Sequence, residues 1–170
     1  MRLWVPLAGF ALLIVVVAIG LWRPADRTVR SALVGKPLPA MTLPASVSAH
    51  PGVDTGAAGG PRLVNVFASW CVPCATEAPQ LMALKAAGVR IEGVAVRDAP
   101  ADTAAFLQRH GDPFAAIGDD RDGRFQLSVG SSGVPETFVI DAQGRIAMQH
   151  IGPIMDADVP AVLKALRGAE

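Results

Sequence analysis

Residues 64–74 read VNVFASWCVPC, an apolar run that leads directly into two cysteines separated by two residues. Residues 63–67 are mostly β-branched and aromatic, which predicts a short buried strand. From residue 74 to residue 87 the sequence predicts a helix that ends at Gly88. The cysteine pair therefore lies where a strand gives way to a helix.

This position favours redox chemistry for Cys71 and Cys74. A helix N-terminus presents unpaired N–H groups and a partial positive charge, and both stabilise a thiolate on Cys71. The spacing brings the two sulfurs within bonding distance, so Cys74 is expected to resolve a mixed disulfide formed by Cys71. Cys74 lies one turn into the helix and is expected to be the less exposed of the two.

Two alternatives compete with the redox interpretation. Half of a metal site is disfavoured because the chain has no other cysteine and its three histidines are scattered along the sequence, at His50, His110 and His150. A purely structural disulfide is disfavoured because so small a ring removes little entropy from the unfolded chain. Redox chemistry is therefore preferred over both.

Composition excludes several classes of protein. Of the 170 residues, 51 % are hydrophobic and 18 % are charged, which rules out a disordered chain. The 15 basic and 15 acidic residues give a formal net charge of zero, so no nucleic-acid partner is expected. The sequence has no glycine-rich phosphate loop. We expect no metal, flavin or nucleotide cofactor.

Strands and helices alternate along the rest of the chain. We expect strands at 90–96, 114–117, 136–141 and 145–150, and helices at 101–110, 121–129 and 156–167. This order predicts an α/β domain whose central mixed sheet is covered on both faces. Prolines 37, 39 and 44 indicate an extended entry, and the Gly-, Ala- and Ser-rich residues 46–60 predict a flexible surface loop.

The N-terminus carries an uncharged run of 20 residues, from residue 3 to residue 22, which as a helix spans roughly 30 Å. Trp4 and Trp22 lie at its ends, as expected of a membrane-spanning helix. A cleaved signal peptide is the alternative, because residues 18–20 form a small-x-small site, but the run is longer than the roughly 7–15 residues of a signal core. We predict a membrane anchor over residues 1–23, a tether over 24–36 and one domain over 37–170.

Several motifs resemble those of thioredoxin-fold oxidoreductases. Residues 64–74 are similar to their active-site segment, and residues 133–141, GVPETFVID, resemble the loop that carries a cis-proline facing the dithiol. Pro79 lies eight residues after Cys71, where thioredoxins carry a helix-kinking proline. Residues 35–39 and 150–153 also match one subgroup, the membrane-anchored DsbE/CcmG thiol:disulfide interchange proteins of cytochrome c maturation. The resemblance covers residues 33–168 and the anchor.

The resemblance implies a thioredoxin-like fold with one N-terminal transmembrane helix. It implies that Cys71 and Cys74 are the catalytic, redox-active pair and that the bond before Pro135 is cis. A cis bond would turn the Val134 backbone toward Cys71, where it meets an extended substrate. Trp70 is expected to form a rim that shields the dithiol.

Two glutamates are further candidates for a redox role. Thioredoxins carry a buried Asp six residues before the first Cys, where this chain has Asn65, which does not titrate. DsbE/CcmG proteins carry a Glu three residues after the second Cys and another beside the cis-proline; these positions are Glu77 and Glu136. A carboxylate near a thiolate raises the thiol pKa by like-charge repulsion and makes the dithiol less oxidising. Alternatively, Glu77 is a helix-turn charge favoured by the dipole and Glu136 a solvated strand-end residue.

The resemblance also implies a reaction and a location. The reaction would be disulfide reduction in apocytochrome c, or in a maturation partner that holds it, by a periplasmic domain on the bacterial inner membrane. Electrons would come from a membrane thiol–disulfide transporter. The positive-inside count opposes this topology, because Arg23, Arg27 and Arg30 follow the apolar run and only Arg2 precedes it. We give the chemistry of the domain more weight than this count.

Other functions stay open at this point. They are a broader extracytoplasmic disulfide reductant, a copper-site thiol reductant or metallochaperone, and a non-catalytic membrane-tethered binding module. Arg97 and Asp98, at the end of the second predicted strand, are loop charges or contacts to a partner.

Overall fold

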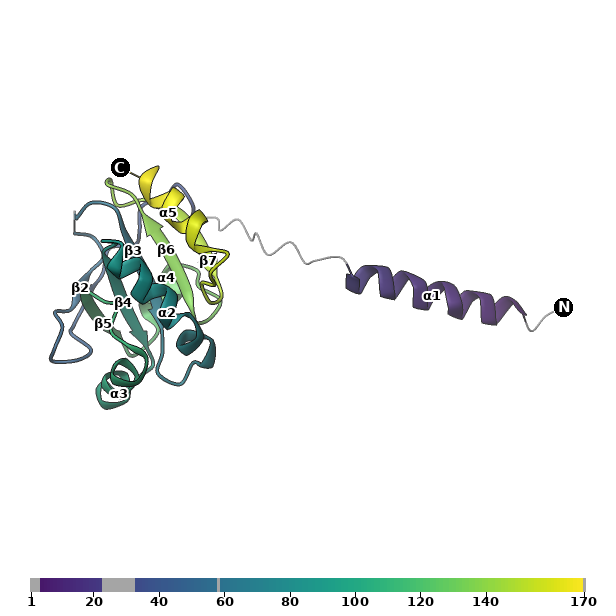
Figure 1. Cartoon of the computed structure of the whole chain (residues 1–170), viewed down its shortest axis with the longest axis horizontal. Coiled ribbons are helices and arrows are strands. Elements are labelled where there is room, and N and C mark those ends of the chain that lie inside the picture. Colours follow the sequence, from purple (N-terminus) through teal and green to yellow (C-terminus); the bar gives the residue numbers. More distant parts are fainter. Residues whose placement is uncertain (1–3, 23–32, 58, 170) are drawn as a thin grey trace.

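Strands and helices alternate in the computed structural model, which describes residues 4–22, 33–57 and 59–169 (Figure 1). The elements in chain order are α1 (Trp4–Trp22), β1 (Thr42–Leu43), β2 (Val53–Asp54), β3 (Arg62–Phe67), α2 (Val72–Ala86), β4 (Ile91–Val96), α3 (Pro100–His110), β5 (Ala116–Asp120), α4 (Arg124–Ser128), β6 (Glu136–Ile140), β7 (Ile146–Ile151) and α5 (Val159–Arg167). The predicted order of elements is confirmed, with bounds that differ by a few residues.

A five-stranded mixed sheet with the order β5-β4-β3-β6-β7 forms the centre of the fold. Strands β3, β4 and β5 run parallel, whereas β6 pairs antiparallel with β3 and β7 pairs antiparallel with β6. The ribbon of β1 and β2 lies against β5, where Ala45 forms a bridge to Gly118. Strand β3 is thus central, and the dithiol follows directly from its carboxyl end.

Each face of the sheet carries its own apolar cluster. On one face, α2, α3 and α5 contribute Leu81, Phe106 and Val162 to a cluster that also contains both cysteines. On the other face, α4 contributes Phe125, which packs with Leu38 from the chain before β1. This arrangement confirms the predicted α/β fold with a mixed sheet covered on both faces.

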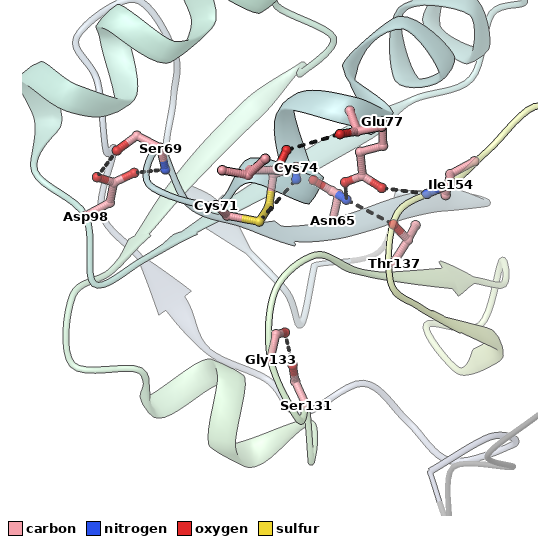
Figure 2. The surroundings of a disulfide bond; sticks show 12 residues. Asn65, Ser69, Cys71, Cys74, Glu77, Asp98, Ser131, Gly133, Thr137 and Ile154 are labelled. Atoms are coloured by element: carbon pink, nitrogen blue, oxygen red, sulfur yellow. Dashed lines mark hydrogen bonds between the residues drawn. A yellow bond between two sulfur atoms is a disulfide. The ribbon is translucent and has the colours of Figure 1, made fainter. Parts of the chain in front are cut away.

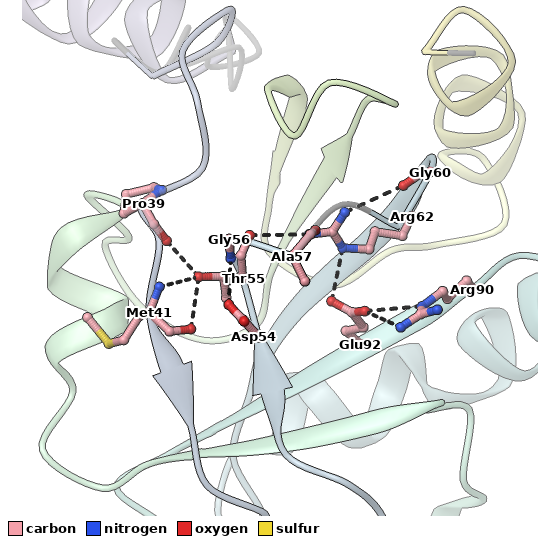
Figure 3. A network of polar contacts seen from close by, with 10 residues as sticks. All are labelled: Pro39, Met41, Asp54, Thr55, Gly56, Ala57, Gly60, Arg62, Arg90 and Glu92. Atoms are coloured by element: carbon pink, nitrogen blue, oxygen red, sulfur yellow. Dashed lines mark hydrogen bonds and ion pairs between the residues drawn. The ribbon is translucent and has the colours of Figure 1, made fainter.

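The prediction of a flexible surface loop over residues 46–60 is wrong. Strand β2 lies within it, and Val53 and Thr55 are buried. Arg62 is buried beneath this segment, where its Nε donates to Glu92 Oε2 at 3.0 Å and its Nη2 to the carbonyl oxygens of Thr55 and Ala57 at 3.3 and 3.4 Å (Figure 3). The segment is ordered by a buried guanidinium that no local sequence pattern indicates.

The N-terminal apolar run is helical from Trp4 to Trp22, as α1. Within residues 4–22, 33–57 and 59–169, no helix is both long enough and apolar enough to cross a membrane. The anchor over residues 1–23 therefore stays a prediction. Most of the tether predicted over 24–36 falls outside the described residues, which resume at Leu33.

Candidate functional site

The two cysteines form a disulfide at the N-terminus of α2, with an Sγ–Sγ distance of 2.10 Å (Figure 2). Cys71 is the N-cap residue of the helix, and its Sγ accepts the backbone N–H of Cys74 at 3.1 Å. A thiolate on Cys71 would face the same N–H group and the positive end of the helix dipole. The predicted placement of the pair at a strand-to-helix junction is confirmed.

The predicted difference in exposure between the cysteines is small. Cys71 is 5 % exposed and Cys74 is 2 % exposed. Cys71 is thus the slightly more exposed of the two, as predicted.

The loop before Cys71 is held by Asp98, at the end of β4. Its carboxylate accepts the N–H of Ser69 at 2.6 Å, the hydroxyl of Ser69 at 2.7 Å and the N–H of Ala99 at 3.0 Å (Figure 2). Asp98 was predicted to be a loop charge or a contact to a partner. It is buried, so the structure supports neither role. It fixes the approach of β3 to the dithiol.

Trp70, which directly precedes Cys71, and Val134 both line one groove. The groove has a volume of about 390 Å³. Trp70 is 61 % exposed, as expected of a rim residue, and its Nε1 donates to the carbonyl oxygen of Arg97 at 3.4 Å. The bond between Val134 and Pro135 is cis, as the resemblance implies. Val134 packs against both apolar clusters, one of which contains both cysteines. Figure 2 shows the loop before it, with Gly133, in the surroundings of the disulfide.

Glu77 is fully buried on α2, one turn after Cys74. Its Oε1 accepts from Asn65 Nδ2 and its Oε2 from the backbone N–H of Ile154, both at 2.9 Å (Figure 2). Burial raises the pKa of Glu77 from its ordinary value of 4.5 to about 7, while the two hydrogen bonds oppose that rise. No acidic residue lies in the first turn of α2, so the alternative of a helix-turn charge is wrong.

Asn65 connects three elements at this site. Its Nδ2 also donates to Thr137 Oγ1 at 2.9 Å, which ties β3 to β6 as well as to α2. Its Oδ1 is buried and has no hydrogen-bond partner among the described residues. Sequence reasoning marked Asn65 as a group that does not titrate and missed its pairing with Glu77. A polar residue in the otherwise apolar run of residues 63–67 was the available signal.

Glu136 lies on the other face of the sheet. It pairs in register with Val66, which belongs to the apolar cluster opposite the dithiol, whereas its neighbour Thr137 faces Asn65. Glu136 is 1 % exposed and accepts a hydrogen bond from Gln149, so it is not a solvated strand-end residue. The structure therefore does not bring the two candidate glutamates together.

Metal-binding groups are not assembled in the part of the chain that the structure describes: no three His, Cys, Asp or Glu side chains there could hold one ion. The histidines have other contacts, such as His50 Nε2 with Asp112 Oδ2 at 2.6 Å.

Known proteins are similar to this chain in sequence and in fold. The redoxin family matches residues 33–166. The thiol:disulfide interchange protein HelX of Rhodobacter capsulatus is 40 % identical over 127 residues, which cover 74 % of this chain and 72 % of that protein. The thiol:disulfide interchange protein DsbE homolog of Paracoccus denitrificans is 36 % identical over 174 residues, covering 94 % and 87 %. A solved structure of a putative thiol:disulfide interchange protein DsbE from Chlorobium tepidum is similar with a TM-score of 0.65 at 27 % identity, covering 78 % of this chain and 94 % of that one.

Proposed function

The chain belongs to the redoxin family and, within it, to the DsbE/HelX thiol:disulfide interchange proteins, and on this basis we propose that it reduces disulfides during cytochrome c maturation. Membership makes it a thiol–disulfide oxidoreductase. Its substrate in this proposal is the haem-binding cysteine pair of apocytochrome c, or a partner that holds that pair in a mixed disulfide. The observation that carries the proposal is the Cys71–Cys74 pair at the N-terminus of α2, facing the cis-proline loop.

The exchange starts from the reduced protein. The Cys71 thiolate attacks one sulfur of the substrate disulfide, so a bond forms between Cys71 and that sulfur while the substrate S–S bond breaks. The sulfur that leaves takes a proton from solvent. The N-cap position of Cys71 supports this step, because the N–H of Cys74 points at its Sγ.

The second step releases the substrate. Cys74 loses its proton and attacks the Sγ of Cys71. The Cys71–Cys74 disulfide forms, the bond from Cys71 to the substrate breaks, and the remaining substrate sulfur leaves as a thiolate that takes a proton from solvent. Cys74 and Glu77 line one small cavity of about 10 Å³, roughly the space of a single water molecule. With a pKa of about 7, the Glu77 carboxylate is suited to accept the Cys74 proton near neutral pH. Two electrons and two protons pass to the substrate.

In this proposal the domain works in the periplasm, held to the inner membrane by residues 1–23. The uncharged run of residues 3–22 supports an anchor, and disulfides form and persist outside the cytoplasm. A membrane thiol–disulfide transporter returns two electrons to the Cys71–Cys74 disulfide after each turnover.

Single cysteine variants test the division of labour between the two thiols. Cys74→Ser leaves a nucleophile that is unable to complete the exchange, so a covalent complex should accumulate through Cys71, dissolve in reductant and be enriched in proteins with a C-x-x-C-H motif. Cys71→Ser should accumulate little, because Cys74 is less exposed and lies inside the helix. Non-reducing gels of both variants in the native membrane measure this asymmetry.

The outcomes separate the classes of function. Equal trapping by both variants would contradict the assigned roles, since equivalent metal ligands predict equal effects. Trapping by neither would favour a metallochaperone or a binding module, and a copper titration of the reduced protein beside a peptide-disulfide reduction assay would then distinguish them. Trapping of proteins without a C-x-x-C-H motif would favour the broader disulfide reductant.

A further inference from the structure

Arg97 has an unusual backbone conformation beside the dithiol. Its φ is +49°, and no other non-glycine residue among those the structure describes has a positive φ. A residue with a side chain is strained in this left-handed region, so the surrounding contacts must hold it there. The N–H of Arg97 donates to Asp120 O at 3.2 Å, and its carbonyl oxygen accepts Trp70 Nε1 at 3.4 Å. The strain lies at the carboxyl end of β4, next to the active-site loop.

Arg97 also lines the groove that we assign to the substrate. The groove is lined by residues that include Trp70, Arg97, Gln126, Leu127, Ser132 and Val134, and of all its lining residues only Arg97 carries a charge. Trp70 and Leu127 are both strongly exposed and give the groove an apolar surface. In parallel sheets, ligands bind in the crevice outside the carboxyl ends of the strands, which is where this groove lies.

The guanidinium of Arg97 is exposed and has no ion-pair partner within the described residues. The carboxylate of Asp98 already accepts three donors from Ser69 and Ala99. The carboxylate of Asp120 accepts two N–H groups of α4, at 3.0 and 2.9 Å. The carboxylates of Asp98 and Asp120 are thus occupied by other donors.

The orientation of Arg97 is also restricted. Its Nη2 lies 2.8 Å from where a Cβ on Gly123 would be, so the guanidinium rests against a turn that only glycine leaves open. A guanidinium without an ion-pair partner is suited to bind a carboxylate, which it does with two parallel hydrogen bonds.

We propose that Arg97 is a specificity-determining residue that binds an acidic side chain close to the disulfide of the substrate. The inference rests on the proposed function, since it names the substrate segment that the same site prefers. That segment is extended, carries an Asp or Glu opposite Arg97, and places an apolar residue against Trp70 and Leu127. Arg97 acts on substrate binding and leaves the reaction of Cys71 with sulfur unchanged.

A pair of disulfide peptides tests this role with the full-length protein in detergent. The peptides are identical except for one residue near the disulfide, which is Glu in one and Gln in the other. For the wild type, kcat/KM should be about threefold to fivefold higher for the Glu peptide at low salt, mainly through a lower KM, and the preference should shrink at high salt. Arg97→Gln should abolish the preference, so that its kcat/KM is the same for the Glu peptide and the Gln peptide.

Two further variants serve as controls. Arg97→Lys keeps the charge and should retain part of the preference, and Arg109→Gln removes an exposed arginine on α3 and should retain all of it. An equal preference in wild type and Arg97→Gln would overturn the role of Arg97, as would no preference in the wild type. Lack of exchange with both peptides would overturn the proposed function itself, and the inference with it.

Discussion

Replacement of Glu77 by Gln removes one buried ionisable group and nearly preserves the volume of the side chain. Folding raises the pKa of Glu77 from 4.5 to about 7 because burial disfavours the carboxylate. That rise corresponds to about 3 kcal/mol of folding free energy that the wild type loses once Glu77 is fully ionised. Gln stays neutral at every pH, so the variant does not lose it.

The sign follows from proton binding. Between pH 4.5 and about 7 the folded chain holds the Glu77 proton and the unfolded chain does not, so the wild-type free energy of unfolding falls as the pH rises through this window. Near pH 4.5 we expect Glu77→Gln and the wild type to have the same free energy of unfolding. Both Gln and protonated Glu are neutral, and each has one carbonyl oxygen that accepts fully from the donors Asn65 and Ile154. At about pH 9 the variant should be more stable by about 3 kcal/mol.

Denaturant unfolding of the oxidised full-length chain in detergent, followed by tryptophan fluorescence, measures this difference at each pH. The intact disulfide keeps the thiols out of the titration. Asp102→Asn, which removes an exposed carboxylate on α3, is the control and should show no comparable gain. A difference between Glu77→Gln and wild type that stays constant from acid to alkaline pH would refute the reasoning. In the reduced protein the same variant should lower the pKa of the Cys71 thiol, measured by thiolate absorbance.

Two other predictions concern topology and stability. A reporter that is active only outside the cytoplasm, fused to Glu170, should give signal, and activity of a cytoplasm-only reporter there would contradict the periplasmic proposal. Arg62→Met should lower the free energy of unfolding by about 3 kcal/mol. The variant removes one of the cations that pair with the buried Glu92 carboxylate, and it removes the hydrogen bond to the carbonyl oxygen of Thr55 in the segment 46–60. The matched variant Arg121→Met breaks a pair between an exposed guanidinium and the partly buried Asp119 and should cost less than about 1 kcal/mol. Equal losses of stability from both variants would show that the burial of Arg62 contributes nothing.

The elements that hold the dithiol were predictable because their signals are local. The strand at 63–67, the helix that stops at Gly88 and the motif at 133–141 each lie within a short stretch of sequence. The segment 46–60 was not predictable in the same way. It is held by Arg62, whose ion-pair partner Glu92 lies 30 residues further along the chain, and its small residues carry no strand or helix period.

The candidate glutamates show a second limit of the sequence. Glu77 and Glu136 were equivalent there, since both lie near motifs of the dithiol. Their placement on opposite faces depends on the register of β6 against β3, a pairing of segments about 70 residues apart. Once Thr137 pairs with Asn65, the alternation of a strand sends Glu136 to the far face. Local motifs do not carry that information.

The position of the buried carboxylate, on the helix and not on the strand, explains the raised pKa of Glu77. In thioredoxins, as the resemblance implies, the buried carboxylate stands on the strand at the position of Asn65; here α2 supplies it as Glu77, and Asn65 donates to it at 2.9 Å. An Asp at position 65 would put two carboxylates at hydrogen-bond distance, where repulsion keeps one of them protonated. The Asn65 amide avoids this repulsion. Because the amide is neutral, it does not compensate the Glu77 carboxylate for its lost hydration as a cation would. The pKa of Glu77 therefore stays at about 7, which suits the proton transfer that we propose between Glu77 and Cys74.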